Sequence, residues 1–146
     1  MMLKEDEIPT ELIKNSKIFH FGTLSMTHDG VRAATKKAIS IAEEANALIS
    51  FDPNLRPPLW KSLDDAKEQV LYGLGHCHIL KISDNEIQWL TGKEDYTDGV
   101  NWIRERYNIP LILVSMGKEG SRAYYEDKIV AVSYTHLRAH ETTLHL

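Results

Sequence analysis

The chain has 146 residues, of which 42% are hydrophobic and 26% are charged, and its formal net charge is -4 at pH 7. This composition is typical of one globular domain with its own core and excludes a disordered chain. Acidic and basic residues are interspersed, so the sequence offers no basic field for a nucleic acid or an anionic membrane. A single cysteine excludes an internal disulfide, and neither a long apolar span nor a signal-peptide pattern is found, so we expect a cytoplasmic protein.

Strands and helices are predicted to alternate along the chain. Short apolar runs predict four strands, at residues 17–22, 48–53, 78–83 and 111–117. Apolar residues at helical spacing predict helices, at residues 31–47, 62–74, 84–92 and 98–108, and a hairpin follows at 121–132. This alternation predicts an α/β fold, in which a mostly parallel sheet with right-handed crossovers carries helices on both faces. Such sheets bind their ligands at the carboxyl ends of the strands.

The first candidate site follows the second predicted strand, in the segment "SFDPNLRPPLW" at residues 50–60. It places Asp52, Asn54 and Arg56 at the carboxyl end of a strand, where a ligand would bind. The same residues would also suit a simple turn, because proline fixes φ, asparagine tolerates unusual backbone conformations, and Arg56 could be solvated. The residues alone leave both interpretations open.

The second candidate site follows the third predicted strand, in the segment "KISDNEIQWLTG" at residues 81–92. Ser83 and Glu86 have the spacing of a capping box, in which a hydroxyl and a carboxylate bind the N–H groups at the start of a helix. A carboxylate at this junction could also hold a magnesium ion and its water shell beside a phosphate. Taken in isolation, the motif favours the cap.

The third candidate site follows the fourth predicted strand, in the segment "LVSMGKEGSRAYY" at residues 113–125. Ser115, Gly117 and Gly120 lie there, and glycine lets the backbone approach a nucleotide phosphate or ribose closely. A tight turn between two strands would need the same glycines. The sequence contains neither G-x-G-x-x-G nor G-x-x-x-x-G-K-[ST], so the dinucleotide fingerprint and the P-loop have no support.

Four segments in this order resemble a known family: "FHFGTLSM", "ALISFDPNLRPPLW", "ILKISDNEIQWLTG" and "LILVSMGKEGSRAYY". They are similar to the PfkB-type carbohydrate kinases and most of all to the fructokinases. The resemblance covers residues 1–131. It implies part of the ribokinase-like fold, in an enzyme that transfers the γ-phosphoryl group of ATP to a sugar hydroxyl with Mg²⁺.

The resemblance also implies roles for the candidate residues. Asn54 and Arg56 would face the sugar or the transferred phosphate, which a guanidinium can bind with two hydrogen bonds. Glu86 matches the glutamate that organises the hydrated metal through water, and Ser83 stands where many members have asparagine. The nucleotide-lining residues of the family correspond to Ser115, Gly117 and Gly120.

Two parts of the family pattern are expected but are not found in the 146 residues. One is the Gly-Ala-Gly-Asp motif, whose aspartate deprotonates the sugar hydroxyl, and the other is the N-terminal region that carries sugar-binding residues and the lid. We therefore expect this chain to have no kinase activity in isolation. Residues 132–146 depart from the family pattern and resemble a translated sequencing adapter, so we interpret them as a non-native tail.

Other classes of function stay open beside the kinase. One is a non-catalytic α/β small-molecule-binding or regulatory module, and another is a dinucleotide-binding domain without the usual fingerprint. Among sugars, the motifs favour fructose, with 2-keto-3-deoxygluconate and ribose as alternatives. The expected partners are ATP, the sugar and, in the full-length protein, a second copy in a homodimer, with no nucleic acid and no membrane.

Overall fold

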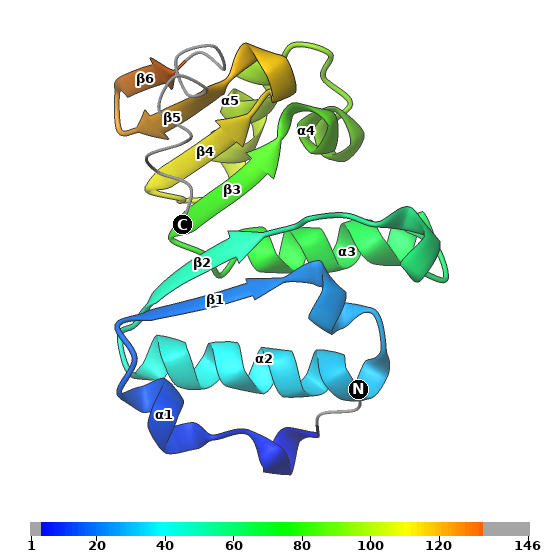
Figure 1. Ribbon diagram of the computed structural model, residues 1–146, viewed down its shortest axis with the longest axis vertical. Helices are drawn as coiled ribbons and strands as arrows, with labels where there is room; N and C mark the ends of the chain where they lie inside the picture. The colour runs from blue at the N-terminus through cyan, green and yellow to red at the C-terminus, as the bar shows by residue number, and fades with distance from the viewer. Residues whose placement is uncertain (1–3, 133–146) are drawn as a thin grey trace. The chain divides into compact units, whose positions relative to one another are not determined.

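The computed structural model describes residues 4–132, which fall into two compact units that divide between Leu80 and Lys81 (Figure 1). Unit 1 contains α1 (Thr10–Lys14), β1 (Ile18–Gly22), α2 (Asp29–Glu44), β2 (Leu48–Asp52) and α3 (Leu63–Leu74). β3 (Ile79–Ser83) crosses the boundary between the two units. Unit 2 contains α4 (Asp84–Thr91), α5 (Tyr96–Arg106), β4 (Leu111–Ser115), β5 (Ser121–Tyr125) and β6 (Lys128–Val132). Single 3-10 turns lie at Glu5–Glu7, Thr23–Met26, Pro57–Leu59 and Gly117–Glu119.

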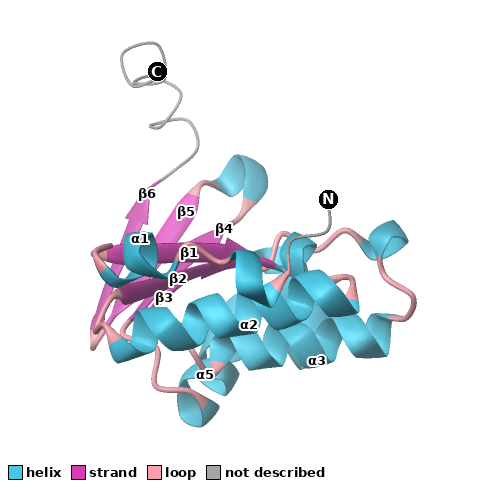
Figure 2. Cartoon of the chain, turned by 90° about the horizontal axis from the view of Figure 1, so that it is seen from below, coloured by secondary structure: helices cyan, strands magenta, loops and turns pink. Residues whose placement is uncertain are grey.

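The strands of unit 1 pair in parallel, as the sequence predicts. Gly22 lies opposite Asp52, so the carboxyl ends of β1 and β2 are side by side. β2 pairs in parallel with β3, with Ser50 opposite Ile79. Figure 2 shows α2 and α3 on the same face of the β1–β2 pair. Right-handed crossovers between strands taken in chain order place these two helices on the same side of the pair.

The core of unit 1 is centred on Phe51 of β2, which is fully buried. Its ring stacks on that of Phe21 in β1, with 4.5 Å between the ring centroids. α3 comes close to the same ring at Gly73, where an added Cβ would lie 2.5 Å from Cε2 of Phe51. Burial of one such side chain stabilises the fold by about 2–3 kcal/mol. Gly73 contributes to this stabilisation because it lets α3 pack closely against the ring of Phe51.

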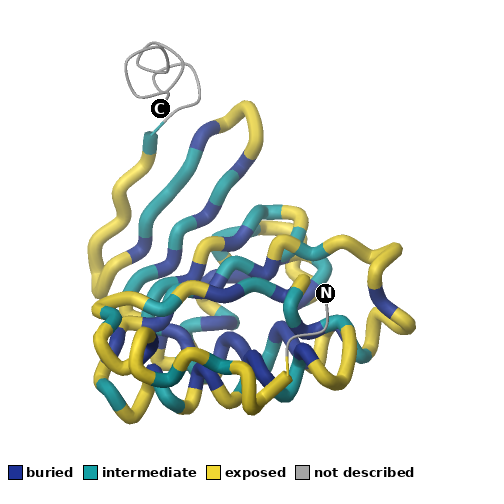
Figure 3. Tube along the Cα trace, turned by 60° about the horizontal axis from the view of Figure 1, so that its bottom comes forward, coloured by how far each residue is buried: buried dark blue, intermediate teal, exposed yellow. Residues whose placement is uncertain are grey.

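Unit 2 combines two helices with an antiparallel set of strands (Figure 1). β4 pairs with β5 and β5 pairs with β6, both antiparallel, and the predicted hairpin turns at Glu126, whose φ is 56°. α4 and α5 approach each other at Gly99, where an added Cβ would clash with Ile87. β6 is exposed along most of its length, as Figure 3 shows, so the buried part of unit 2 lies between β4, β5 and the helices.

All the predicted strands and helices are present, and the ends of α3 and α4 follow the predicted signals. The hydroxyl of Ser62 accepts a hydrogen bond from the backbone N–H of Asp65 and caps α3. Gly92 ends α4 in the left-handed conformation, with φ at 74°. The sequence analysis did not predict α1, a helix of 5 residues. The predicted non-native tail, apart from the end of β6, lies outside the described residues, and no helix within residues 4–132 is long and apolar enough to cross a membrane.

Candidate functional site

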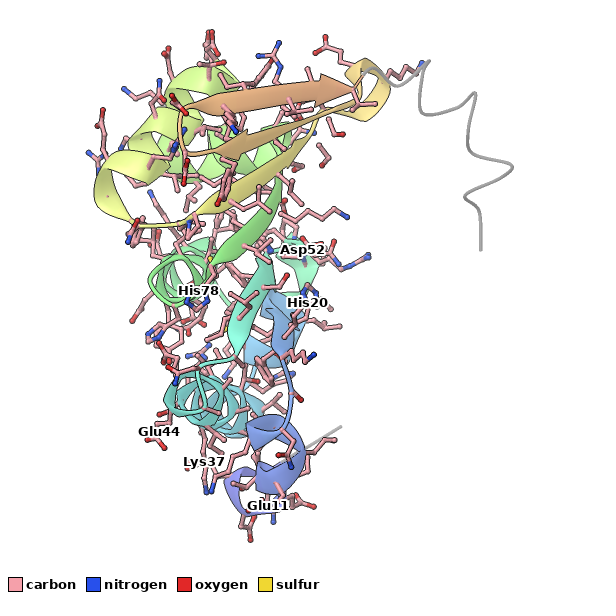
Figure 4. All side chains as sticks on the ribbon, turned by 90° about the vertical axis from the view of Figure 1, so that its left-hand side faces the viewer. Glu11, His20, Lys37, Glu44, Asp52 and His78 are labelled. Atoms are coloured by element: carbon pink, nitrogen blue, oxygen red, sulfur yellow. The ribbon has the colours of Figure 1, made fainter. Side chains whose placement is uncertain are left out.

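The polar residues predicted at the tip of β2 form a tight turn in unit 1. Asp52, labelled in Figure 4, ends the strand, and its Oδ1 accepts a hydrogen bond from the backbone N–H of Asn54 at 3.1 Å. Asn54 has a positive φ of 41°, which asparagine tolerates better than most residues. The side chains of Asn54 and Arg56 are both exposed. The turn therefore has the predicted geometry and presents an amide and a guanidinium to solvent.

Unit 2 contains a cleft of about 560 Å³ where β3 and β4 end. Its lining residues come from the start of α4 and from the loop after β4: Ser83, Asp84, Asn85, Ser115, Met116, Gly117, Gly120 and Ser121. All three predicted nucleotide-lining residues are in this set. The carboxyl ends of two strands thus border one hollow, as expected for a ligand site in an α/β protein.

The loop that follows β4 is closed by its own backbone. The N–H of Met116 donates to the carbonyl of Gly120 at 2.8 Å, and the N–H of Glu119 donates to the carbonyl of Met116 at 3.0 Å. Gly117 and Gly120 both have positive φ, at 55° and 101°. Only glycine adopts the second of these conformations readily, so Gly120 is needed for this loop shape, and Gly117 leaves its backbone open to a ligand.

The predicted capping box is present at the start of α4. The N–H of Glu86 donates to Oγ of Ser83 at 3.1 Å, and the N–H of Ser83 donates to Oε1 of Glu86 at 3.0 Å. Asp84 and Asn85 line the cleft, whereas Glu86 is not among its lining residues. Asp84 and Asn85 were not predicted as site residues, although their position directly after a strand is a signal for such a site.

Within residues 4–132, no three His, Cys, Asp or Glu side chains form a group that could hold a metal ion by themselves. Magnesium needs fewer protein ligands, because it keeps several waters and binds one or two carboxylates together with substrate phosphates. Asp84 lines the cleft, and Glu86 lies in the same first turn of α4. Asp84 supplies one carboxylate at the cleft, and the metal role of Glu86 stays a prediction.

The structure divides the predicted site residues between the two units. Ser115, Gly117 and Gly120 lie together around the cleft of unit 2, at the start of the helix that carries Glu86. Asn54 and Arg56 lie on the turn of unit 1. The prediction that both groups face one ligand therefore stays a prediction.

Comparison with known proteins identifies the family. The pfkB family carbohydrate kinase model matches residues 1–136. "Probable fructokinase-2" of Arabidopsis thaliana is 39% identical over 143 residues, which are 98% of this chain and 44% of that protein. Fructokinase-1 of Zea mays is 38% identical over 143 residues, and again 44% of its length is covered.

Solved structures agree with the sequence matches. Fructokinase from Vibrio cholerae O395, solved with fructose, ADP and a calcium ion, superposes with a TM-score of 0.82 at 28% identity, over 90% of this chain and 42% of that one. This likeness confirms the predicted ribokinase-like fold for the part that the chain covers. The chain spans less than half the length of the relatives that it matches. It belongs to the pfkB family of carbohydrate kinases.

Proposed function

We propose that the chain is the middle portion of an ATP-dependent sugar kinase, that it binds the nucleotide in the cleft of unit 2, and that fructose is the sugar of the whole protein. The observation that carries this proposal is the cleft where β3 and β4 end, bordered by a glycine loop with two positive φ angles. Its volume of about 560 Å³ is in the range of small-molecule sites. Fructokinase from Vibrio cholerae O395, which shares the fold, was solved with ADP and fructose.

The nucleotide would lie against the loop that runs from Ser115 to Gly120. Because Gly117 has no side chain and nothing lies within 4 Å of where its Cβ would be, a phosphate or ribose can approach the backbone there. The hydroxyl of Ser115 can donate to a phosphate oxygen. This arrangement supports binding of ATP and ADP.

Glu86, acting through water, and Asp84 would hold a magnesium ion at the start of α4. When bound, the ion neutralises charge on the phosphates of the nucleotide during phosphoryl transfer. The contribution of the chain is to position the two carboxylates, since the capping box fixes the first turn of the helix. The calcium ion in the related fructokinase supports a divalent cation in this family without identifying it as magnesium.

Asn54 and Arg56 would bind the sugar or the phosphoryl group that is being transferred. A guanidinium at a strand tip can make two parallel hydrogen bonds to phosphate oxygens, and an amide can bind sugar hydroxyls. Both side chains are exposed and therefore accessible to a ligand. The turn of unit 1 thus supplies groups of the chemistry that the acceptor side of the reaction needs.

The isolated chain would bind nucleotide without transferring phosphate. Its 146 residues contain no Gly-Ala-Gly-Asp segment, which in this family supplies the base for the sugar hydroxyl. Phosphoryl transfer depends almost entirely on positioning and on electrostatic stabilisation, so a protein without the base and its anion site has little catalysis left.

The test is a coupled kinase assay of the protein extended to the length of its relatives, with fructose, ribose and 2-keto-3-deoxygluconate as acceptors. We expect activity, highest with fructose, and none from the 146-residue chain. Calorimetric titration of the short chain with ADP should show binding that the Gly117→Val variant weakens. An extended protein that binds ADP but transfers no phosphate would instead favour the non-catalytic module.

Arg56→Ala in the extended protein should lower kcat/KM for the sugar about 30-fold, because a charge-assisted hydrogen bond contributes about 2 kcal/mol. The free energy of unfolding should stay the same, since the side chain is exposed. Lys61→Ala, which removes another exposed cation five positions further on, is the matched control and should leave the kinetics unchanged. If Arg56→Ala has wild-type kinetics, Arg56 is a solvated turn residue and its role in the proposal is wrong.

A further inference from the structure

The turn that carries Asn54 and Arg56 is anchored from another part of unit 1 by Thr23. This threonine begins the 3-10 turn after β1 and is only 1% exposed. Its hydroxyl donates to the carbonyl oxygen of Pro53, and its backbone N–H donates to the same oxygen at 3.4 Å. Thr23 and Pro53 are 30 positions apart in the sequence, so this contact is tertiary.

The 3-10 turn that Thr23 begins is itself bound by α2, which an ion pair links to α3. The hydroxyl of Thr35 in α2 donates to the carbonyl of Ser25 at 3.0 Å, and Nε of Arg32 donates to the carbonyl of Met26 at 2.9 Å. Arg32 also forms an ion pair with Asp65, at the start of α3, with 2.8 Å between the charged atoms. Both side chains of this pair are mostly buried, at 18% and 29% exposed. Two hydrogen bonds therefore join α2 to the turn Thr23–Met26, and one ion pair joins α2 to α3.

The supported turn meets a backbone that is left-handed at one residue. Asn54 follows Pro53 directly and has a φ of 41°. A residue in this region persists only where its surroundings over-determine it. The internal bond from Asn54 to Asp52 supplies one constraint, and the hydroxyl of Thr23 supplies the other by fixing the carbonyl of the preceding peptide.

We propose that Thr23 is a positioning residue, which sets the backbone of residues 52–56 so that Asn54 and Arg56 present their side chains to the sugar or phosphate. The role of the two side chains in binding a ligand rests on the proposed function, whereas the role of Thr23 in setting the backbone of the turn does not. Without the hydroxyl, the carbonyl of Pro53 loses one of the two hydrogen bonds that Thr23 donates to it. A buried carbonyl that loses a donor is expected to move, and the side chains of Asn54 and Arg56 move with it.

The test compares Thr23→Val, which has the same shape without the hydroxyl, with Thr23→Ser, which keeps the hydroxyl. Thr27→Val is the control, because its hydroxyl bonds to Leu24 within the same loop and not to the residue 52–56 turn. In the 146-residue chain, NMR coupling constants report φ of Asn54. We expect Thr23→Val to move Asn54 out of the positive region and the other two variants to leave it there. Thr23→Ala serves in place of Thr23→Val if the latter does not fold.

The second readout is the kinetics of the extended protein. Thr23→Val should raise KM for the sugar about tenfold while KM for ATP is unchanged, and Thr23→Ser should restore the wild-type value. A variant that only folds less well would lower kcat alone, with both KM values unchanged. Wild-type φ of Asn54 in Thr23→Val overturns the inference, as does an unchanged KM for the sugar. An extended wild-type protein without kinase activity removes the proposed function and the ligand role, whereas the NMR result still decides whether Thr23 sets the turn.

Discussion

The two loops that carry the candidate site are held in place by opposite means. The loop from Met116 to Gly120 is closed by hydrogen bonds between its own backbone groups and depends on glycines with positive φ. The turn from Asp52 to Arg56 contains the hydrogen bond from the Asn54 N–H to Asp52, and its Pro53 carbonyl accepts a hydrogen bond from Thr23, in another part of the chain. One loop is specified locally and the other by tertiary structure.

This difference determines how each loop should respond to change. A locally specified loop tolerates changes in the rest of its unit but not at Gly120, since no other residue adopts the conformation of Gly120 cheaply. A loop fixed from outside tolerates changes of its own residues better than changes in the element that holds it. The predictions below test this contrast in each unit.

The largest effect is expected for Gly120→Val in unit 2. Gly120 is buried, and its φ of 101° and ψ of -140° are close to a region that only glycine occupies, so the substitution should cost about 3 kcal/mol. Hydrogen exchange of the β4 and β5 amides should report this loss, and the β1 and β2 amides should not. Gly117→Asn is the matched control: with φ at 55° and open space around the Cβ, it should cost under about 1 kcal/mol. Equal effects of the two substitutions would contradict local specification by backbone conformation.

A smaller effect is expected for Gly22→Ala in unit 1. Its φ of -142° suits any residue, but a Cβ there would lie 2.9 Å from the carbonyl oxygen of Asp52, a backbone atom that cannot move cheaply. We expect a loss of about 2 kcal/mol in the free energy of unfolding, together with a shift of the NMR signals of Asn54.

Gly30→Ala is the control for that substitution. Gly30 lies in the first turn of α2 with nothing within 4 Å of its Cβ position, so alanine should stabilise the helix by about 0.5–1 kcal/mol. The two alanine substitutions therefore have opposite signs within one unit. A stable Gly22→Ala variant with unchanged Asn54 signals would show that the turn does not depend on the close approach of β1.

The contrast also explains which parts of the site could be predicted from the sequence. The loop after β4 was predicted because its glycines and its serine are neighbours in the chain. The cap formed by Ser83 and Glu86 was predicted for the same reason, since a spacing of three residues is visible in any sequence. The bond from Thr23 to Pro53 was not predicted, because it joins two strand ends that only parallel pairing brings together.

Elements follow the same rule as the loops. Strands and long helices were predicted because their apolar periodicity repeats over many residues. α1 was missed, since 5 residues are too few for a periodic pattern and only Ile13 among them is buried. The placement of both crossover helices of unit 1 on one face follows from strand order, which alternation of elements does not reveal.

The smallest effect is expected for Cys77, which is the single cysteine of the chain and lies in unit 1. Its thiol can therefore report on the opening of unit 1 alone. Burial raises the pKa of its thiol to about 12, whereas an unfolded cysteine titrates at about 8.5. The pKa of the thiol is higher in the folded protein, so the free energy of unfolding is at its full value below pH 8.5 and falls as pH rises toward 12. At pH 9 the free energy of unfolding should be lower by about 0.8 kcal/mol. Hydrogen exchange of the β1 and β2 amides should show this loss, and Cys77→Ala should abolish it. Rapid reaction of the native thiol with a disulfide reagent at pH 8 would contradict the buried, protonated state. The same reaction can be measured in the Gly22→Ala and Gly117→Asn variants. If both substitutions accelerate the reaction of Cys77 equally, the two units do not open separately.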